Sequence, residues 1–299
     1  VIAGLQRTGT TMLHRLLSED PGLRALYSWE ALSPVPADRA PRDSSREARI
    51  LAARLAENGL RYMAPEFFAI HPAEALAPEE EVILLDFSFL STVPEATLNV
   101  PTYSRWLETQ DQTPAYEYLR RMLQILMWHT PRERWVLKTP HHLEWLDTLL
   151  AVFPGARIIQ THRDPLKTIA SLSSMITHGR GVFSDDVDPH AVGAHWSRKV
   201  YRMVDRAMTT REGPHASQFL DVSYYDLMKA PMHEVERIYG FVGRTLTGDV
   251  QLRVDASRDG NKQHRYGRHS YRLEDFGLTA ETVEPSIARY RERFAIPKE

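Results

Sequence analysis

The chain opens with VIAGLQRTGTTMLHRLL (residues 1–17), and this stretch decides the fold class. It contains a short apolar strand, a loop with Gly4 and Gly9, and a helix with regularly spaced apolar residues. In such a unit, the N–H groups of the loop and of the helix N-terminus point towards a bound anion. The glycine spacing matches the first half of a P-loop, but Thr10 and Thr11 stand where that motif has Lys and Ser or Thr. We therefore predict a loop for a phosphorylated donor other than a magnesium nucleoside triphosphate, with a ligand-free strand–turn–helix junction as the alternative.

Composition narrows the classes of protein. The 299 residues are 42% hydrophobic and 25% charged, which is typical of a globular chain. The net charge of −2 leaves no overall basic field for nucleic acid, and the absence of cysteine excludes disulfides, thiolate metal sites and cysteine nucleophiles. No apolar run approaches the ~20 residues of a membrane span. We expect a cytoplasmic protein without a transmembrane segment or a nucleic-acid partner. Its oligomeric state stays open, and so does an upstream segment, because the chain does not begin with Met.

Strand and helix patterns alternate in the middle of the chain. Short connections join a strand, a helix, a second strand and a second helix, at residues 134–138, 142–152, 156–161 and 165–177. This alternation predicts an α/β fold with a parallel β-sheet flanked by helices, to which the opening strand and helix belong. Because ligands of such sheets bind beyond the carboxyl ends of the strands, residues 4–11, 138–142 and 162–164 should line one crevice.

The other periodic segments add helices around this sheet. We predict helices at 44–63, 113–129, 190–211, 232–242 and 248–257, and a further β segment at 219–223. Residues 179–188 are typical of a flexible acidic connection, and the acidic run 79–81 of a solvated face or a helix start. One domain over residues 1–299, with helical insertions, is the simplest organisation, since no internal repeat or low-complexity linker occurs.

Two motifs together resemble those of a known family. GLQRTGTT at residues 4–11 is followed about 150 residues later by THRDP at 161–165 and by Ser171. This pair resembles the sulfotransferases, enzymes that take a sulfuryl group from 3'-phosphoadenosine-5'-phosphosulfate (PAPS) and release 3'-phosphoadenosine 5'-phosphate (PAP). The resemblance covers nearly the whole chain. It is strongest to the broad bacterial sulfotransferase group, with first-loop similarity to the tyrosylprotein sulfotransferases, and it implies a P-loop-like sulfotransferase fold.

The resemblance assigns the first loop to the 5'-phosphosulfate of the donor. The residues concerned are Arg7, Thr8, Gly9, Thr10 and Thr11, whose backbone N–H groups and last two hydroxyls would hold the 5'-phosphate. Arg7 would neutralise the charge that develops on the bridging oxygen as the S–O bond breaks, so we count it as a catalytic residue as well. The alternative for Arg7 is a solvent-facing loop position.

The same resemblance assigns other residues to the rest of the donor. Arg163 and Ser171 would bind the 3'-phosphate, because an arginine fork with a hydroxyl suits a dianion. This pair would distinguish PAPS from ATP. Tyr224 matches a family tyrosine near the adenosine. Lys262 and Arg265 belong to the basic tail, where family members close a loop over the donor, although the Arg-Lys-Gly signature of the cytosolic enzymes is absent.

The acceptor hydroxyl needs a base, and two candidates compete. Glu30 stands at a position similar to the catalytic Glu of the tyrosylprotein enzymes, and its alternative role is a structural carboxylate paired with an arginine. His141 and His142 follow a segment similar to the Lys-Thr-His segment of the cytosolic enzymes, but Pro140 occupies the position of the family's His. We favour Glu30 over His141. Lys138 would stabilise the bridging or sulfuryl oxygens, and no metal is expected.

The predicted function is transfer of a sulfuryl group from PAPS to a hydroxyl by in-line displacement. A P-loop nucleotide kinase and a non-catalytic nucleotide-binding protein of the same fold are the alternatives. A kinase needs a magnesium-binding carboxylate beside the threonines of the first helix, and a non-catalytic protein would not bring Arg7, Lys138 and Glu30 to one point. Aromatic residues between positions 60 and 128 are typical of a core or of an apolar pocket, and we expect a small or lipid-like acceptor.

Overall fold

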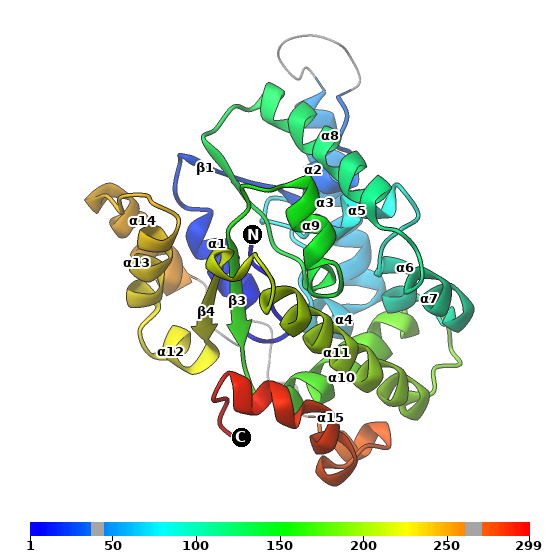
Figure 1. Ribbon diagram of the computed structural model, residues 1–299. Helices are drawn as coiled ribbons and strands as arrows, with labels where there is room; N and C mark the ends of the chain where they lie inside the picture. Colours follow the sequence, from blue (N-terminus) through cyan, green and yellow to red (C-terminus); the bar gives the residue numbers. More distant parts are fainter. Residues whose placement is uncertain (37–44, 261–270) are drawn as a thin grey trace.

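Four short strands lie at the centre of the molecule (Figure 1). The computed structural model describes residues 1–36, 45–260 and 271–299. The strands, in chain order, are β1 (Leu23–Ala25), β2 (Arg134–Val136), β3 (Ile158–His162) and β4 (Phe219–Ser223). β1 pairs with β2 and β3 pairs with β4, and both pairs are parallel.

The opening segment joins the two strand pairs into one sheet. Ile2 bridges Lys138, just beyond β2, and Ile159 in β3, in parallel orientation on both sides. The Ile2 N–H donates to the Leu137 carbonyl (2.7 Å), and the Ala3 N–H donates to the Ile159 carbonyl (2.9 Å). The order across the sheet is therefore β1, β2, the opening segment, β3 and β4, which confirms the predicted parallel α/β fold.

Helices cover both faces of this sheet. The first half of the chain contributes α1 (Thr10–Leu17), α2 (Ser28–Leu32), α3 (Arg46–Met63), α4 (Pro65–Ile70), α5 (Val82–Asp86), α6 (Val93–Thr97), α7 (Pro101–Leu107), α8 (Thr113–His129) and the 3-10 helix η1 (Pro140–Glu144). The second half contributes α9 (Leu146–Val152), α10 (Pro165–Gly181), α11 (Pro189–Arg211), η2 (Ala216–Gln218), α12 (Tyr224–Lys229), α13 (Pro231–Phe241), α14 (Gly248–Gly260), η3 (Leu273–Phe276) and α15 (Ala280–Arg293). Apolar residues of α1, α13 and α14 form one core cluster, and those of α8, α9, α10, α11 and α15 form a larger one across the sheet (Figure 1).

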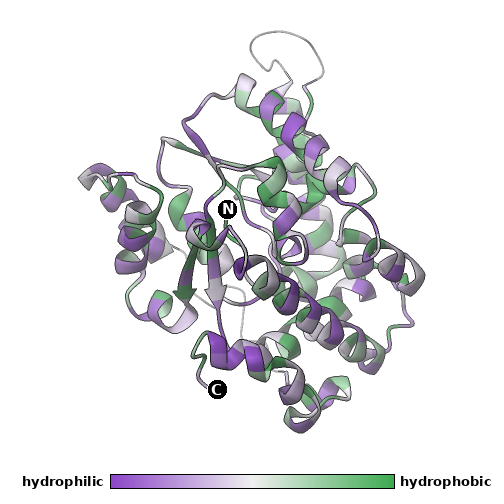
Figure 2. Cartoon of the chain, in the orientation of Figure 1, coloured by the Kyte–Doolittle hydropathy of each residue, from purple (hydrophilic) through white to green (hydrophobic). Residues whose placement is uncertain are grey.

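The burial of the elements follows this layering. All five residues of β3 are buried, which is typical of a central strand in a parallel sheet that is covered on both faces. The outer helices carry hydrophilic and hydrophobic stretches in alternation (Figure 2), as expected for helices with one face towards the core. Within the described ranges, no helix is both long and apolar enough to cross a membrane.

The long amphipathic helices agree with their sequence patterns, and a short one does not. α3, α8 and α11 confirm the helices predicted at 44–63, 113–129 and 190–211. The helix predicted at 142–152 is interrupted, because η1 precedes α9 and the helical hydrogen bonding restarts at Leu146. The Thr139 hydroxyl accepts the His141 N–H at 3.3 Å and begins this tighter turn.

Two further differences concern the second half of the chain. The predicted flexible connection at 179–188 is wrong at its beginning, because α10 continues to Gly181. Arg180 is buried there and donates to the Glu95 carbonyl at 2.7 Å, which ties the end of α10 to α6. α12 and α15 were not predicted, and α15 packs on α10 and α11 near the end of β3.

Gly4 lies where the opening strand meets the loop, and it has no room for a side chain. A Cβ atom at this position would lie 2.0 Å from Thr161 Oγ1 and 3.0 Å from Thr8 Oγ1. We expect Gly4→Ala to lower the free energy of unfolding by about 1–3 kcal/mol through overpacking. Urea unfolding measures this, with Gly155→Ala as the control, because a Cβ at Gly155 would meet nothing within 4 Å. Equal losses in the two variants would contradict the expectation.

Candidate active site

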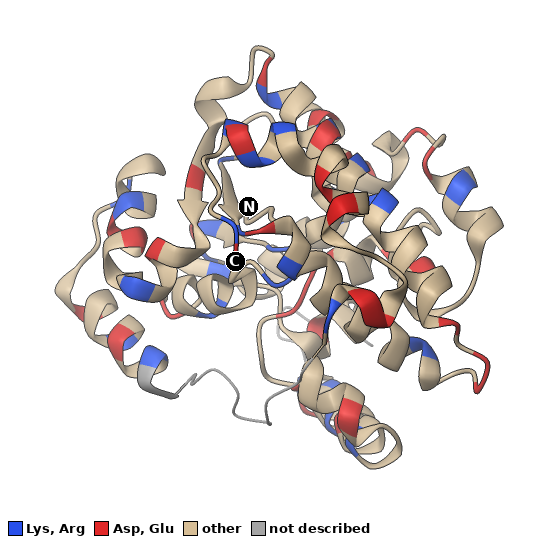
Figure 3. Ribbon diagram, turned by 90° about the horizontal axis from the view of Figure 1, so that it is seen from below, with Lys and Arg blue, Asp and Glu red and all other residues tan. Residues whose placement is uncertain are grey.

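The carboxyl ends of the strands carry the predicted site residues. Taken across the sheet, these ends lead to Glu30 after β1, Lys138 after β2, Arg7 after the opening segment, Arg163 after β3 and Tyr224 after β4. Figure 3 views the molecule from below, where the strand arrows of Figure 1 end, and basic residues lie near the centre of this view. Because the strands are parallel, residues far apart in the sequence reach one edge of the sheet.

The first loop has the backbone geometry of an anion cradle. Arg7 (φ 68°) and Gly9 (φ 86°) both adopt the left-handed conformation, and alternation of this kind turns successive N–H groups to one side. Gly9 is also the N-cap residue of α1, so the loop leads directly into a helix N-terminus. Left-handed backbone is unfavourable for a residue such as Arg7, and strain of this kind is concentrated at functional sites.

The loop threonines have different surroundings. The Thr8 hydroxyl is buried, donates to the Leu5 carbonyl (2.6 Å) and lies 2.6 Å from Thr161 Oγ1, so it holds the loop in place. Thr10 is buried and Thr11 is exposed. Within the described chain, no carboxylate hydrogen-bonds to either hydroxyl.

The residues predicted to bind the donor contact one another although they are far apart in the sequence. Arg7 Nε donates to Ser171 Oγ at 3.1 Å. Arg163 Nη1 donates to the Arg7 carbonyl at 3.1 Å, and the Arg163 guanidinium lies over the Tyr224 ring, 4.2 Å from its centroid. These contacts connect the first loop, α10 and the ends of β3 and β4 in a single cluster.

Arg163 already holds an anion that belongs to the chain itself. Its Nε and Nη2 donate to the two carboxylate oxygens of Glu299 at 2.8 and 2.9 Å. The Tyr225 hydroxyl donates to the same carboxylate at 2.8 Å, and the Glu299 N–H donates to Asp164 at 2.8 Å. The hydrogen bonds from Arg163 hold the pKa of Glu299 below its ordinary value. The fork of Arg163 is therefore shaped and charged to receive an anion, and no sequence pattern had indicated Glu299 or Tyr225.

Lys138 is also paired with a carboxylate of the chain. Its ammonium contacts Glu80, whose other oxygen accepts from the Thr139 hydroxyl at 3.0 Å. The Lys138 N–H donates to Glu81 at 2.8 Å, and Glu81 is fully buried. The prediction of a solvated face at 79–81 is therefore wrong, although the run does precede a helix start, since α5 begins at Val82. A run of acidic residues has the same pattern in sequence whether it faces water or buried donors.

A buried histidine lies behind this pair. His142 contacts Glu81 Oε1 through Nε2 (2.7 Å) and the Tyr116 hydroxyl through Nδ1 (2.7 Å). Burial alone raises the pKa of Glu81, but the hydrogen bond and charge of His142 outweigh burial and hold that pKa below its ordinary value. Both ring nitrogens of His142 are therefore occupied. Through Glu81, which accepts the Lys138 N–H, His142 helps to hold the Lys138 backbone in place.

The two candidate bases are enclosed in different ways. Glu30 is buried, and both its oxygens pair with the Arg24 guanidinium, which lies over the Trp135 ring. No hydrogen bond or ion pair within the described residues joins Glu30 to Arg7 or Lys138. His141 is buried too; its Nδ1 lies 3.3 Å from Thr92 Oγ1, and burial holds its pKa well below the ordinary value. The lowered pKa favours the neutral ring. The His141 Nε2 has no hydrogen-bond partner in the described chain.

Two residues predicted to close over the donor, Lys262 and Arg265, lie outside the described residues. Within the described part, no group of three or more His, Asp or Glu side chains is arranged to hold a metal ion.

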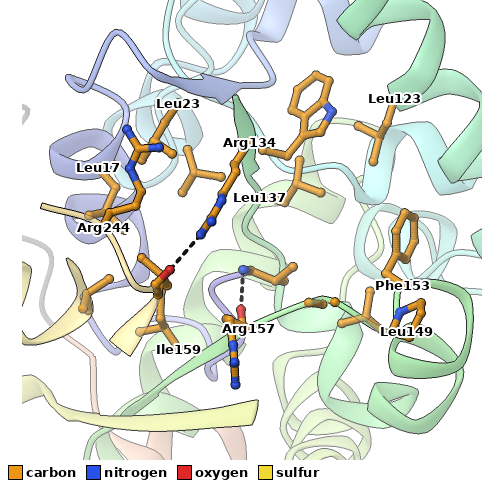
Figure 4. Close-up of a pocket in the computed structure, with 18 of the residues that line it drawn as sticks. Leu17, Leu23, Leu123, Arg134, Leu137, Leu149, Phe153, Arg157, Ile159 and Arg244 are labelled. Atoms are coloured by element: carbon orange, nitrogen blue, oxygen red, sulfur yellow. Dashed lines mark hydrogen bonds between the residues drawn. The ribbon is translucent and has the colours of Figure 1, made fainter. Parts of the chain in front are cut away.

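A cavity of about 740 Å³ lies at the opposite edge of the sheet, and Figure 4 shows its lining. Leu17, Leu123, Phe153 and other apolar side chains surround it, with arginines at its margin. Val1, Leu23, Arg134 and Arg157, at or before the starts of the strands, contribute to its wall. It contains none of the predicted site residues, and it faces the amino ends of the strands, whereas ligands of parallel sheets bind at the carboxyl ends.

Comparison with known proteins agrees with this geometry. A model of the sulfotransferase family matches residues 1–248. The solved sulfotransferase STF9 of Mycobacterium avium is 29% identical with a TM-score of 0.88, over 100% of this chain and 77% of that chain. The solved sulfotransferase STF1 of Mycobacterium tuberculosis is 34% identical with a TM-score of 0.83, over 96% of this chain and 75% of that chain. The omega-hydroxy-beta-dihydromenaquinone-9 sulfotransferase Stf3 of Mycobacterium bovis is 24% identical over 300 residues, which cover 91% of this chain and 69% of that protein.

The depressed pKa of Glu81 predicts an acid-dependent loss of stability. As the pH falls below about 4.3, the ordinary carboxyl value, the unfolded chain takes up the proton before the folded chain does. The stabilisation from Glu81 is therefore complete above that pH and is lost as the pH falls through the lower folded pKa. Glu81→Gln should flatten the pH dependence of the unfolding free energy between about pH 5 and pH 3. Urea unfolding at several pH values measures this pH dependence.

Glu79→Gln is the matched control for this series, because Glu79 makes no ion pair within the described residues and should keep the wild-type pH dependence. If Glu81→Gln and the wild type lost stability with equal steepness, the role given to the contact between Glu81 and His142 would be wrong.

Proposed function

The chain belongs to the sulfotransferase family, and on this premise we propose that it transfers the sulfuryl group of PAPS to a hydroxyl group of a lipid-like acceptor. The single observation that carries the proposal is the cluster in which Arg7, Ser171, Arg163 and Tyr224 contact one another at the carboxyl edge of the sheet. Sulfotransferases generally use PAPS as donor, and these side chains suit its two phosphate groups and its adenosine.

The proposed donor lies along the edge of the sheet. The 5'-phosphosulfate binds to the first loop and to the N-terminus of α1. There Arg7 can neutralise the charge on the leaving oxygen. The 3'-phosphate binds to Arg163 and Ser171, and the adenosine lies beside Tyr224. A phosphate dianion and the Glu299 carboxylate cannot share one guanidinium without strong repulsion, so donor binding displaces Glu299 from Arg163.

The acceptor approaches from the side of β1 and β2 in this proposal. Its hydroxyl oxygen attacks the sulfur while the bond from sulfur to the 5'-phosphate oxygen breaks, and its proton passes to a base of the protein. Lys138, which Glu80 orients, stabilises the sulfuryl oxygens. For the base we propose Glu30, with His141 as the alternative. Both oxygens of Glu30 pair with Arg24, and one oxygen must leave that pair to accept the proton.

A lipid-like acceptor is supported by the name of the mycobacterial relative, which acts on an omega-hydroxy-beta-dihydromenaquinone. The segment between positions 60 and 128 also exposes large aromatic side chains, among them Phe87, Phe89 and Trp106. Phe89 adopts a left-handed backbone (φ 57°) that the Tyr103 hydroxyl holds by donating to the Phe89 carbonyl at 3.2 Å. An exposed aromatic residue kept in a strained conformation supports a contact with an apolar ligand.

The donor assignment predicts two opposite changes in affinity. Arg163→Ala should weaken the binding of PAP by about 10- to 100-fold, because a charge-assisted hydrogen-bonded pair contributes about 1.5–3 kcal/mol. Glu299→Gln should strengthen the binding of PAP, because the carboxylate of residue 299 no longer competes for the Arg163 guanidinium. Calorimetry with PAP and with ADP measures both, and ADP, which lacks the 3'-phosphate, should respond little to either change.

A wild-type protein that binds ADP as tightly as PAP would overturn the donor assignment and favour the P-loop kinase. Weaker binding of PAP after Glu299→Gln would instead mean that Glu299 orients the Arg163 guanidinium and does not compete for it.

The proposed base is tested by turnover. Glu30→Gln should lower the rate of transfer by about 100-fold or more while PAP affinity stays unchanged, because the amide cannot accept the proton. Retained PAP affinity also reports that the variant folds after losing its charged contact with Arg24. Full activity of Glu30→Gln together with an inactive His141→Asn would move the base to His141. Tight PAP binding without transfer to any hydroxylated lipid would support the non-catalytic alternative.

A further inference from the structure

The outward face of α3 carries three large apolar side chains among its polar ones, which is unusual for a surface helix. Leu51 is 59% exposed, Leu55 is 64% exposed and Tyr62 is 89% exposed. At 100° per residue, these three side chains lie within about 40° of one another, in a row about 16 Å long. Ile50 and Ala53 are buried on the opposite side and attach the helix to the protein. The row Leu51–Leu55–Tyr62 therefore faces water, with Asn58 between its second and third members, at a position where a surface helix normally carries polar residues only.

Positive charge accompanies this row. Of the four arginines of α3, Arg49 is buried towards the protein, and Arg46 and Arg61 pair with Glu47 and Glu57. Arg54 is exposed next to the row and makes no ion pair with any described residue. Exposed leucines and a tyrosine beside an arginine suit a helix that lies in the plane of a membrane surface with anionic lipids.

α3 is attached to the segment that carries the proposed base. Arg49 Nε donates to the Ser33 carbonyl at 2.7 Å, and its guanidinium lies over the Trp29 ring, 4.7 Å from the centroid. Trp29 precedes Glu30 in α2, which follows the edge strand β1. The apolar row is thus carried by the helix that covers the acceptor side of the sheet.

We propose that the row Leu51–Leu55–Tyr62 docks on the surface of an anionic lipid bilayer, from which the enzyme receives its acceptor. The row inserts at the level of the lipid headgroups, and Arg54 contacts lipid phosphates. The part of this proposal that concerns the acceptor rests on the proposed function, whereas the docking itself does not. A second copy of the chain is a poorer occupant, because one row of three side chains is far smaller than the about 800 Å² per partner of a stable dimer.

Vesicle sedimentation tests the proposal with the whole chain. The wild type should sediment with vesicles of phosphatidylglycerol and phosphatidylcholine, and less with phosphatidylcholine alone or at high salt. The double substitution Leu51→Glu and Leu55→Glu should weaken this binding by more than about tenfold. Leu252→Glu is the matched control, because Leu252 is 72% exposed on α14, on the other side of the molecule in Figure 1, and this variant should bind as the wild type does.

PAP affinity without lipid separates this proposal from the proposed function. It should be unchanged in the double variant, which also shows that the variant folds. A wild type that does not sediment with the vesicles, or a double variant that sediments equally well, would overturn the docking surface. A wild-type dimer in analytical ultracentrifugation that the double variant abolishes would assign the row to a second copy and overturn the lipid assignment. Absence of PAP binding in the wild type would overturn the proposed function and leave the sedimentation result intact.

Discussion

The hydrogen bonds of the opening segment to the strands on either side are the constraint on which the site depends. Ile2 and Ala3 lie between β2 and β3, so two separate strand pairs become one parallel sheet. The middle position of this segment sets the first loop between the end of β2 and the end of β3. Arg7 therefore reaches Ser171 on one side, while Lys138 lies on the other. Arg7, Ser171 and Lys138 reach one edge of the sheet only because the opening segment is central.

Three cations along this edge are paired with carboxylates of the same chain. A charge that is withdrawn from water needs a partner, since an unpaired buried charge costs several kcal/mol. The chain thus neutralises these cations itself, and in the proposed complex the arrival of an anionic donor at Arg163 would exchange one anion for another. Such an exchange would stabilise the complex less than filling an empty site, so under this proposal Glu299 sets part of the donor affinity. The pairs are Arg24–Glu30, Lys138–Glu80 and Arg163–Glu299.

The accuracy of the sequence-based predictions follows the range of the interactions. α8 and α11 were predicted because an amphipathic helix repeats its apolar residues every 3.6 positions, and that pattern needs no distant partner. The residues predicted to bind the donor could be proposed from the sequence because most of them lie in short motifs at strand ends. The helix start at the acidic run was predicted but the burial of Glu81 was not, since Glu81 meets His142 across 61 positions and no pattern near the run indicates that contact. Glu299 was missed for the same reason, because it meets Arg163 across 136 positions.

The sequence alone carried the α/β class, the glycine loop before the first helix and the family resemblance, because each is encoded in residues that are close together in the chain. The tertiary structure alone decided which strand ends are neighbours. That order brings Arg7 to Ser171, Glu80 to Lys138 and Glu299 to the fork of Arg163. The physical reason is that charge pairing depends on distance in space, and the packing of the whole sheet, which no local pattern contains, sets those distances.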